Sequence, residues 1–139
     1  MPYEIIDHTA DIKIRVRGNT LQNLFLEAAT AMTELMKPLQ IPDRHEYVKT
    51  PERKIIVEAP DTTALLIDFL SEVLALSQTN KEIYNRMTFS HFSPTKVEAV
   101  LGEVRVEKFD EDIKAVTYHE ADVRQNEKGE WETMIVFDI

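Results

Sequence analysis

The sequence predicts a single α+β domain over residues 1–139, in which two helices pack on a mostly antiparallel sheet. Three observations support this fold class. Residues 12–17 alternate apolar and basic side chains, as a half-buried strand does. Two later segments place apolar residues at helical spacing, and nearly everything after residue 85 has the pattern of strands and turns. A chain of 139 residues is long enough to enclose one hydrophobic core.

The first strand and the first helix are predicted from adjacent patterns. In residues 12–17 (IKIRVR) the apolar side chains face one way and the basic ones the other. Gly18 ends this strand, and Asn19 or Thr20 can cap the helix that follows. The helix is expected to end before Pro38. Its apolar face comprises Leu21, Leu24, Phe25, Ala28, Ala29, Met32, Leu35 and Met36.

A second strand and helix follow a polar connection. Residues 37–51 contain three prolines and many charges, which predict a loop. Residues 53–59 (RKIIVEA) predict a strand, and Asp61, after Pro60, is the expected N-cap of the second helix. Because this helix is apolar on more than one side, we expect it to lie deep in the domain. Its apolar residues are Leu65, Leu66, Ile67, Phe69, Leu70, Val73, Leu74 and Leu76.

The last third of the chain predicts a series of strands. These are residues 86–92, then 96–109 with a bulge or bend at Gly102, then 112–125. Residues 126–129 (NEKG) predict a turn. The final strand places Trp131, Thr133, Ile135, Phe137 and Ile139 on one face.

Composition and charge limit the cellular compartments and the classes of binding partner that we expect for this protein. There are no cysteines, which excludes disulfides, thiolate metal sites and thiol nucleophiles. The N-terminus shows no signal peptide and no apolar run is long enough to span a membrane, so we expect a cytoplasmic protein. A net charge of −9 opposes binding to phosphate backbones. We therefore expect no direct nucleic-acid binding, and a protein partner or a cation instead.

Common catalytic motifs are absent from the sequence. Three glycines in 139 residues leave no phosphate-binding glycine loop, and there is no nucleophile elbow or HExxH motif. The four histidines (His8, His45, His91 and His119) lack zinc-ligand spacing. Each is therefore expected to be a surface or hydrogen-bonded residue.

The remaining candidates for chemistry are carboxylates at strand ends. Asp11 begins an alternating strand, and Asp138 comes next to last in the final one, before Ile139 and its α-carboxylate. A final strand that stays apolar to its end predicts a fixed terminus, which would hold these anions close together. Oxygen ligands of this kind suit Ca²⁺ or Mg²⁺. Turn-forming or solvated aspartates are the commoner explanation of such a pattern, and spacing alone favours it.

Several motifs resemble those of the archease family. YEIIDHTADIKIRVRG (3–18) is similar to the family's opening, and EAPDTTALLIDFLSEVLAL (58–76) to its acidic strand end and apolar helix. DIKAVTYHEADV (112–123) resembles its KAxTYH motif, and the closing MIVFDI resembles its last strand with a terminal Asp-Ile. These matches follow the family's order and span the chain.

The resemblance implies a function and a site. Archeases are accessory proteins of the RtcB-type RNA ligase in tRNA splicing and RNA repair, and are not ligases themselves. They promote metal-dependent guanylylation of the ligase and allow it multiple turnover. The resemblance places a divalent-cation site at Asp11, Asp138 and Ile139, with Ca²⁺ the expected ion and Mg²⁺ or Mn²⁺ as alternatives. It gives no catalytic residue, and the oligomeric state stays open.

The chain departs from the family pattern at two places. Lys13 stands where members often carry glycine, and residues 106–114 (VEKFDEDIK) lack a histidine that many members have before KAxTYH. His8 and His119 lie in matching motifs without an assigned role. Two other functions stay open on the residues alone: a stand-alone metal-dependent phosphohydrolase, and a chaperone-like binding module in which the cation is structural.

Overall fold

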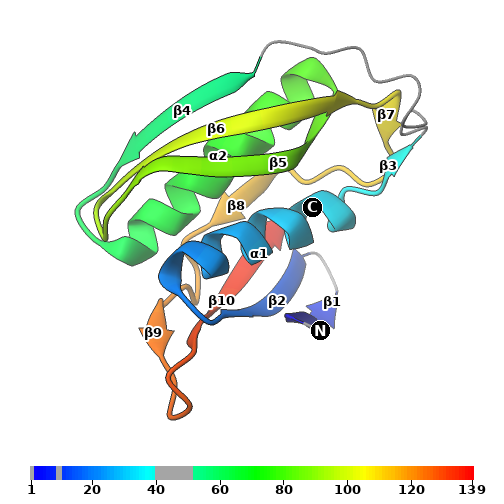
Figure 1. Cartoon of the computed structure of the whole chain (residues 1–139). Helices are drawn as coiled ribbons and strands as arrows, with labels where there is room; N and C mark the ends of the chain where they lie inside the picture. Colours follow the sequence, from blue (N-terminus) through cyan, green and yellow to red (C-terminus); the bar gives the residue numbers. More distant parts are fainter. Residues whose placement is uncertain (1, 9–10, 40–51) are drawn as a thin grey trace.

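Two helices lie between two antiparallel sheets in the computed structural model, which describes residues 2–8, 11–39 and 52–139 (Figure 1). The helices are α1 (Leu21–Leu35) and α2 (Thr62–Asn80). The predicted α+β class with two helices on antiparallel sheets is confirmed, but the strands divide into separate sheets. The first sheet contains β1 (Tyr3–His8), β2 (Asp11–Gly18), β8 (Ala115–Thr117), β9 (Arg124–Gln125) and β10 (Trp131–Asp138). The second contains β4 (Arg53–Glu58), β5 (Glu82–Phe92) and β6 (Lys96–Arg105), and β3 (Pro38–Leu39) pairs with β7 (Lys108–Phe109).

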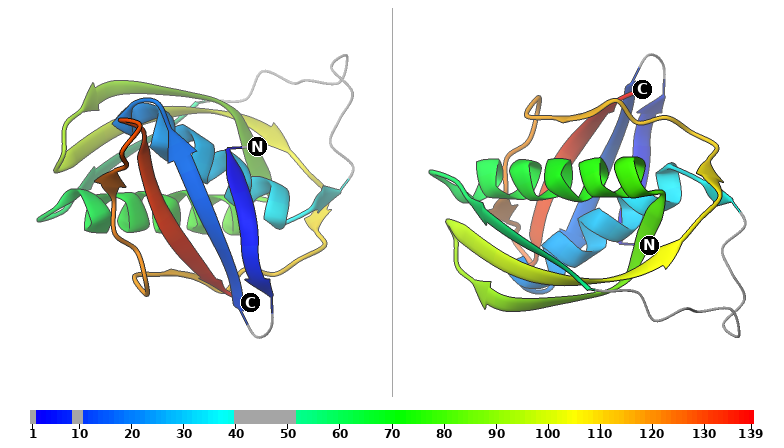
Figure 2. Two further views of the ribbon diagram at one scale, coloured as in Figure 1. Left: turned by 90° about the horizontal axis from the view of Figure 1, so that it is seen from below. Right: turned by 90° about the horizontal axis from the view of Figure 1, so that it is seen from above.

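The last strand of the chain lies inside the first sheet. The strand order is β1-β2-β10-β8, with β9 paired to the first part of β10, and every pairing is antiparallel. Figure 2 shows the end of β10 beside the start of β2. The sheet therefore joins the two ends of the sequence at its centre.

Both helices begin at N-cap residues that the sequence predicted. The Thr20 hydroxyl accepts a hydrogen bond from the Asn23 N–H at 3.0 Å, which settles the choice between Asn19 and Thr20. The Asp61 carboxylate accepts from the Ala64 N–H at 2.8 Å, as predicted. Gly18 ends β2 against α1, where an added Cβ would lie 2.4 Å from the Leu24 nitrogen. Only glycine fits this turn from strand to helix.

The core fills both interfaces of the helical layer. α1 packs mainly on β2, whose inner side chains Ile12, Ile14 and Val16 are buried, and α2 contacts β8 in one sheet and β4, β5 and β6 in the other. Phe25 of α1 lies 5.5 Å from Phe69 of α2, measured between ring centroids. Both rings also contact phenylalanines of β5. The expected deep position of α2 is confirmed, and in the described part of the chain no helix is long and apolar enough to cross a membrane.

Four sequence expectations differ from the structure. The segment 96–109, predicted as one strand, divides into β6, which ends at Arg105, and β7, which pairs with β3. β5 begins at Glu82 rather than at residue 86, directly after Lys81 closes α2 in a left-handed conformation (φ 54°). The bulge expected at Gly102 lies on the opposite strand, between Tyr84 and Arg86, and the Arg86 side chain occupies the space beside the glycine.

The segment 112–125, predicted as one strand, forms only the short strands β8 and β9 with a loop between them. The predicted turn at 126–129 is present, with Gly129 at φ 81°. Most of the predicted loop at 37–51 lies outside the described residues, although Pro38 and Leu39 form β3.

Neighbouring isoleucines of β4 provide a test of this layering. Ile55 faces the helices and is 6% exposed, whereas Ile56 faces outward and is 64% exposed. We expect Ile55→Ala to lower the free energy of unfolding by about 2–5 kcal/mol, because it leaves a cavity in the core. Ile56→Ala, in the same strand, should change it by less than about 1 kcal/mol. Urea denaturation measures both, and equal losses would contradict the assigned faces of β4.

Candidate functional site

The register of β2 and β10 places two of the predicted site residues opposite each other. Asp11, the first residue of β2, pairs with Asp138, the last residue of β10. Directly opposed residues in antiparallel strands have Cβ atoms about 4.5–5.5 Å apart and project on the same side. Their neighbours Ile12 and Phe137 are buried against the helices, so both carboxylates lie on the outer face. The structure thus brings Asp11 and Asp138 together, which spacing alone could not predict.

The end of β10 is paired with β2 on one side and hydrogen-bonded to the segment around β8 on the other. The Asp138 carbonyl accepts a hydrogen bond from the Lys114 N–H at 2.7 Å, and the Val136 carbonyl accepts from the Thr117 hydroxyl at 2.9 Å. Ile139 packs partly buried against the core. The fixed end that the sequence predicted is therefore present, and the main chain of Ile139 directly follows the paired carboxylates.

Neither Asp11 nor Asp138 forms an ion pair with another residue whose side chain the structure describes. Like charges directly opposite in a sheet repel each other, and a bound cation would remove this repulsion. Two carboxylates do not complete a metal site: among the described residues no group of three or more His, Cys, Asp or Glu side chains could hold a metal ion. Main-chain oxygens, as at Ile139, suit the hard cations that carboxylates bind.

A lysine and a glutamate lie beside the aspartates on the same face. Lys13 Nζ contacts Glu120 Oε2 at 2.5 Å, and the hydrogen bond from Lys13 holds the pKa of Glu120 below its ordinary value. His119 Nε2 is 3.9 Å from the same glutamate oxygen and its side chain is 76% exposed. The backbone of His8 pairs with Ile12 in β1, next to Asp11. Sequence reasoning missed Glu120, because only the folded loop brings it to Lys13.

Comparisons with known proteins identify the family of this chain. The model of the archease protein family (MTH1598/TM1083) matches residues 3–139. The chain belongs to the archease family. It is 32% identical to the protein archease of Methanopyrus kandleri over 146 residues, covering 100% of both chains. It is 31% identical to the protein archease of Methanosarcina barkeri over 145 residues, covering 99% of this chain and 95% of the relative.

Solved structures show the same fold. The solution structure of Methanobacterium thermoautotrophicum protein 1598 has a TM-score of 0.72 and 25% identity, covering 99% of each chain. An archease from Thermotoga maritima, described as a possible chaperone, has a TM-score of 0.66 at 22% identity, covering 98% of this chain and 96% of its own. The resemblance seen in the sequence is thus confirmed for the family and the fold.

The TYH motif of this archease anchors the loop that carries Glu120. The Tyr118 hydroxyl donates a hydrogen bond to the Asp68 carboxylate of α2, which raises the pKa of Tyr118. Tyr118 is nevertheless 57% exposed. His91 and His119 are exposed, as expected for surface residues. His45 lies outside the described residues.

A second pair of carboxylates is buried inside the archease fold, and sequence reasoning missed it. The side chains of Glu82 and Glu103 are 1% and 3% exposed. Arg53 donates two hydrogen bonds to Glu82, at 2.7 and 2.9 Å, and its Nε lies 3.1 Å from Glu103. Burial is the largest influence on the pKa of Glu82 and raises it, but the hydrogen bonds and charge of Arg53, together with the hydrogen bond from Glu103, outweigh burial and hold that pKa below its ordinary value. This cluster ties β4 to β5 and β6, and its single arginine offsets the charge of one of the two carboxylates.

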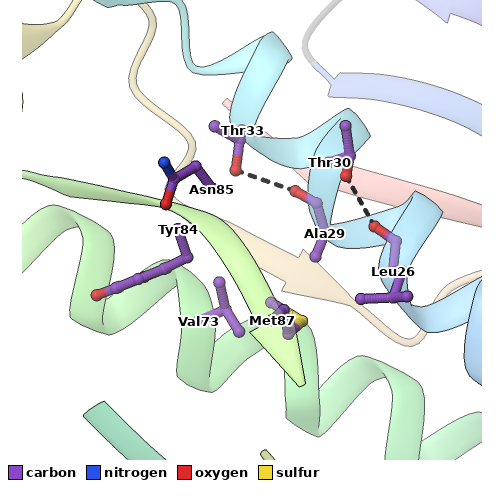
Figure 3. A pocket seen from close by; sticks show the side chains of 8 residues that line it. All are labelled: Leu26, Ala29, Thr30, Thr33, Val73, Tyr84, Asn85 and Met87. Carbon is purple, nitrogen blue, oxygen red and sulfur yellow. Dashed lines mark hydrogen bonds between the residues drawn. The ribbon is translucent and has the colours of Figure 1, made fainter. Parts of the chain in front are cut away.

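A small pocket between α1, α2 and β5 offers little chemistry. It has a volume of about 90 Å³ and is distant in sequence and topology from Asp11 and Asp138 (Figure 3). Two of its three lining hydroxyl groups, those of Thr30 and Thr33, donate to carbonyls of their own helix, at 2.9 and 3.0 Å. We therefore interpret it as a packing gap. Its lining residues are Leu26, Ala29, Thr30, Thr33, Val73, Tyr84, Asn85 and Met87.

Replacing one of the paired aspartates tests their repulsion. We expect Asp138→Asn, measured without divalent cations, to raise the free energy of unfolding by about 0.2–1 kcal/mol. Glu132→Gln is the matched control, because Glu132 lies opposite Arg17 in the same pair of strands. That change should lower stability or leave it unchanged. Loss of stability in Asp138→Asn would argue against an uncompensated pair.

Removing the partly exposed Arg53 tests the second cluster. We expect Arg53→Met to lower the free energy of unfolding at pH 7 by about 2–4 kcal/mol, below the full value for a buried pair because Arg53 is partly exposed. In the wild type the lowered pKa of Glu82 contributes stability above its unfolded pKa, which is lost as pH falls. Without Arg53, burial raises that pKa and the sign reverses, so the deficit should shrink toward pH 4.

Denaturation at pH 7 and at pH 4 measures how much unfolding free energy Arg53→Met loses relative to the wild type. Arg86→Met is the control. Arg86 is 72% exposed and forms a long ion pair of 3.9 Å with Glu52, so its removal should cost less than about 1 kcal/mol. A deficit for Arg53→Met that is the same at both pH values would contradict the role given to the glutamates.

Proposed function

We propose that this archease is an accessory activator of an RtcB-type RNA ligase in tRNA splicing and RNA repair. In this role it is not itself an enzyme: it promotes the metal-dependent guanylylation of the ligase and allows the ligase multiple turnover. Membership in the archease family supports the proposal. The observation that carries its chemistry is the direct opposition of Asp11 and Asp138 on an exposed face.

The proposal includes a divalent-cation site formed by Asp11, Asp138 and the main-chain oxygens of Ile139. This donor set fits a hard cation because it consists of oxygen atoms, and its two carboxylate groups repel each other when no cation lies between them. Ca²⁺ is the ion we favour, with Mg²⁺ and Mn²⁺ as alternatives. A cation bound there supplies positive charge of the kind that neutralises phosphoryl oxygens during nucleotidyl transfer.

The proposed partner is the ligase protein and not its RNA. The net charge of −9 disfavours direct contact with a phosphate backbone. Such a protein can act on the ligase without competing for the nucleic acid. The proposal places both proteins in the cytoplasm, where tRNA splicing partners of this kind would meet.

A stimulation assay with the cognate ligase, guanosine triphosphate and a 3′-phosphate RNA tests the proposal. We expect the protein to raise the rate of ligase guanylylation and to increase the number of ligations per ligase molecule above one. Asp11→Asn and Asp138→Asn should each reduce the stimulation by at least about tenfold, the size of effect seen when metal sites are disturbed.

Asp110→Asn is the control, because Asp110 is an exposed carboxylate on the connection after β7. It should leave the stimulation unchanged. Equal stimulation by all variants would remove the cation from the proposal. Absence of any stimulation would contradict the ligase role and favour the phosphohydrolase or chaperone-like alternatives, which release of phosphate or protection of an unfolded protein would then separate.

A further inference from the structure

We propose that the free edge of β4 is a dimerisation surface, on which a second copy of this chain docks its own β4 antiparallel about Ile56. In the dimer the second sheets of both copies form one continuous sheet. This surface does not include Asp11 or Asp138, so the inference goes beyond the proposed ligase role and does not depend on it. It stands on the backbone orientation, the regularity and the charges of β4.

β4 is an edge strand that leaves half of its backbone hydrogen-bonding groups on its free side. Among the described strands it pairs only with β6 (Figure 1). The Ala59 N–H donates to the Thr95 carbonyl at 3.0 Å, in the register of the β4–β6 ladder. Because the direction of these groups alternates along an antiparallel strand, those of Val57 also point to β6. The N–H and C=O of Ile56 therefore point to the free edge.

The free side of β4 is regular, whereas the other long edge strands are interrupted. β1 shifts register between Ile5 and Asp7, and β5 shifts register twice. Bulges of this kind disturb pairing and commonly protect sheet edges from other chains. β4 keeps a single register with β6 over residues 53–58. Its free side therefore presents an even row of donors and acceptors that another strand can pair with.

The charges along β4 select a second copy and one register. Lys54, Ile56 and Glu58 direct both their side chains to the outer face and their backbone groups to the free edge. When Ile56 lies opposite its own copy, Lys54 lies opposite Glu58 of the second copy, and a twofold axis repeats this pair. A shift by two residues one way sets Glu52 opposite Glu58. The opposite shift leaves Lys54 without a charged partner.

The side chains of this surface are accessible. Ile56 is an exposed large apolar residue, and the Glu58 side chain is 69% exposed. Glu58 has only a long ion pair with Lys96, at 3.5 Å, and exposed pairs of this kind contribute little. Lys54 is exposed and forms no ion pair with another described residue. Docking of a second β4 removes Ile56 from water and gives both charges a partner across the interface.

Sedimentation equilibrium of the full chain, at concentrations up to about 1 mM, tests the proposal, because a single pair of strands is a small and therefore weak interface. We expect a concentration-dependent equilibrium between monomer and dimer. Lys54→Glu and Glu58→Lys should each raise the dissociation constant by at least about tenfold, because each sets like charges opposite each other twice in the symmetric dimer. The double variant restores opposite charges and should dimerise within about threefold of the wild type.

Lys128→Glu and Glu127→Lys are the matched controls. They make the same changes of charge at exposed residues in the turn between β9 and β10, which lies in the first sheet. Each should change the dissociation constant by less than about twofold, because salt screens charges that are distant from the interface. Melting temperatures of dilute samples show whether each variant is folded.

Amide hydrogen exchange locates the interface on β4. In dilute wild-type protein the N–H groups of Lys54, Ile56 and Glu58 should exchange rapidly, because they point to solvent. At concentrations where the dimer predominates their exchange should slow several-fold, because each then donates to the second copy. The N–H groups of Ile55 and Val57 bond to β6 and should exchange slowly at every concentration.

Each outcome supports or overturns the proposal. A dimer that both single variants weaken, that the double variant restores and that protects the three edge amides supports it. If the wild type stays monomeric at the highest concentration, the proposal is wrong. A dimer that ignores the charge reversals, or that leaves the edge amides unprotected, also contradicts it. Protection of these amides only after the ligase is added would assign the edge to that partner and overturn the second copy as its occupant.

Discussion

The antiparallel pairing of β2 with β10 is the interaction on which the rest of the structure depends. On the inner face its side chains form the floor on which α1 packs. On the outer face the same register sets Asp11 against Asp138. Because side chains alternate along a strand, a shift by one residue would move the apolar set to solvent and separate the aspartates at once. Burial of the core therefore fixes the geometry of the site.

The two carboxylate pairs of this domain differ in their burial and in their ion-pair partners. Glu82 and Glu103 are buried and share one arginine from a neighbouring strand, which offsets part of their charge within the fold. Asp11 and Asp138 lie at the end of a sheet, and no other described residue forms an ion pair with them. The first arrangement stabilises the second sheet. The second lies on the outer face of the first sheet.

Local features of the fold could be predicted from the sequence, and non-local ones could not. The caps at Thr20 and Asp61 and the faces of β2 follow from short-range patterns that the structure retains. The start of β5 at Glu82 was missed because a buried glutamate looks like a solvated one in sequence. The opposition of residues 11 and 138 depends on strand order, and the contact of Lys13 with Glu120 depends on a loop where a strand was expected. The spacing of these residues in the sequence predicts neither contact.

The central position of β10 also has a consequence for biosynthesis. A ribosome makes this strand last among the described elements, yet it fills the gap between β2 and β8. Until it emerges, β2 has β1 on one side and an unpaired edge on the other, and such edges attract other strands. The nascent chain can form its helices and its second sheet early, since their contacts are closer in sequence. Closure of the first sheet therefore follows the formation of the other described elements, and the two aspartates meet only after β10 has been made.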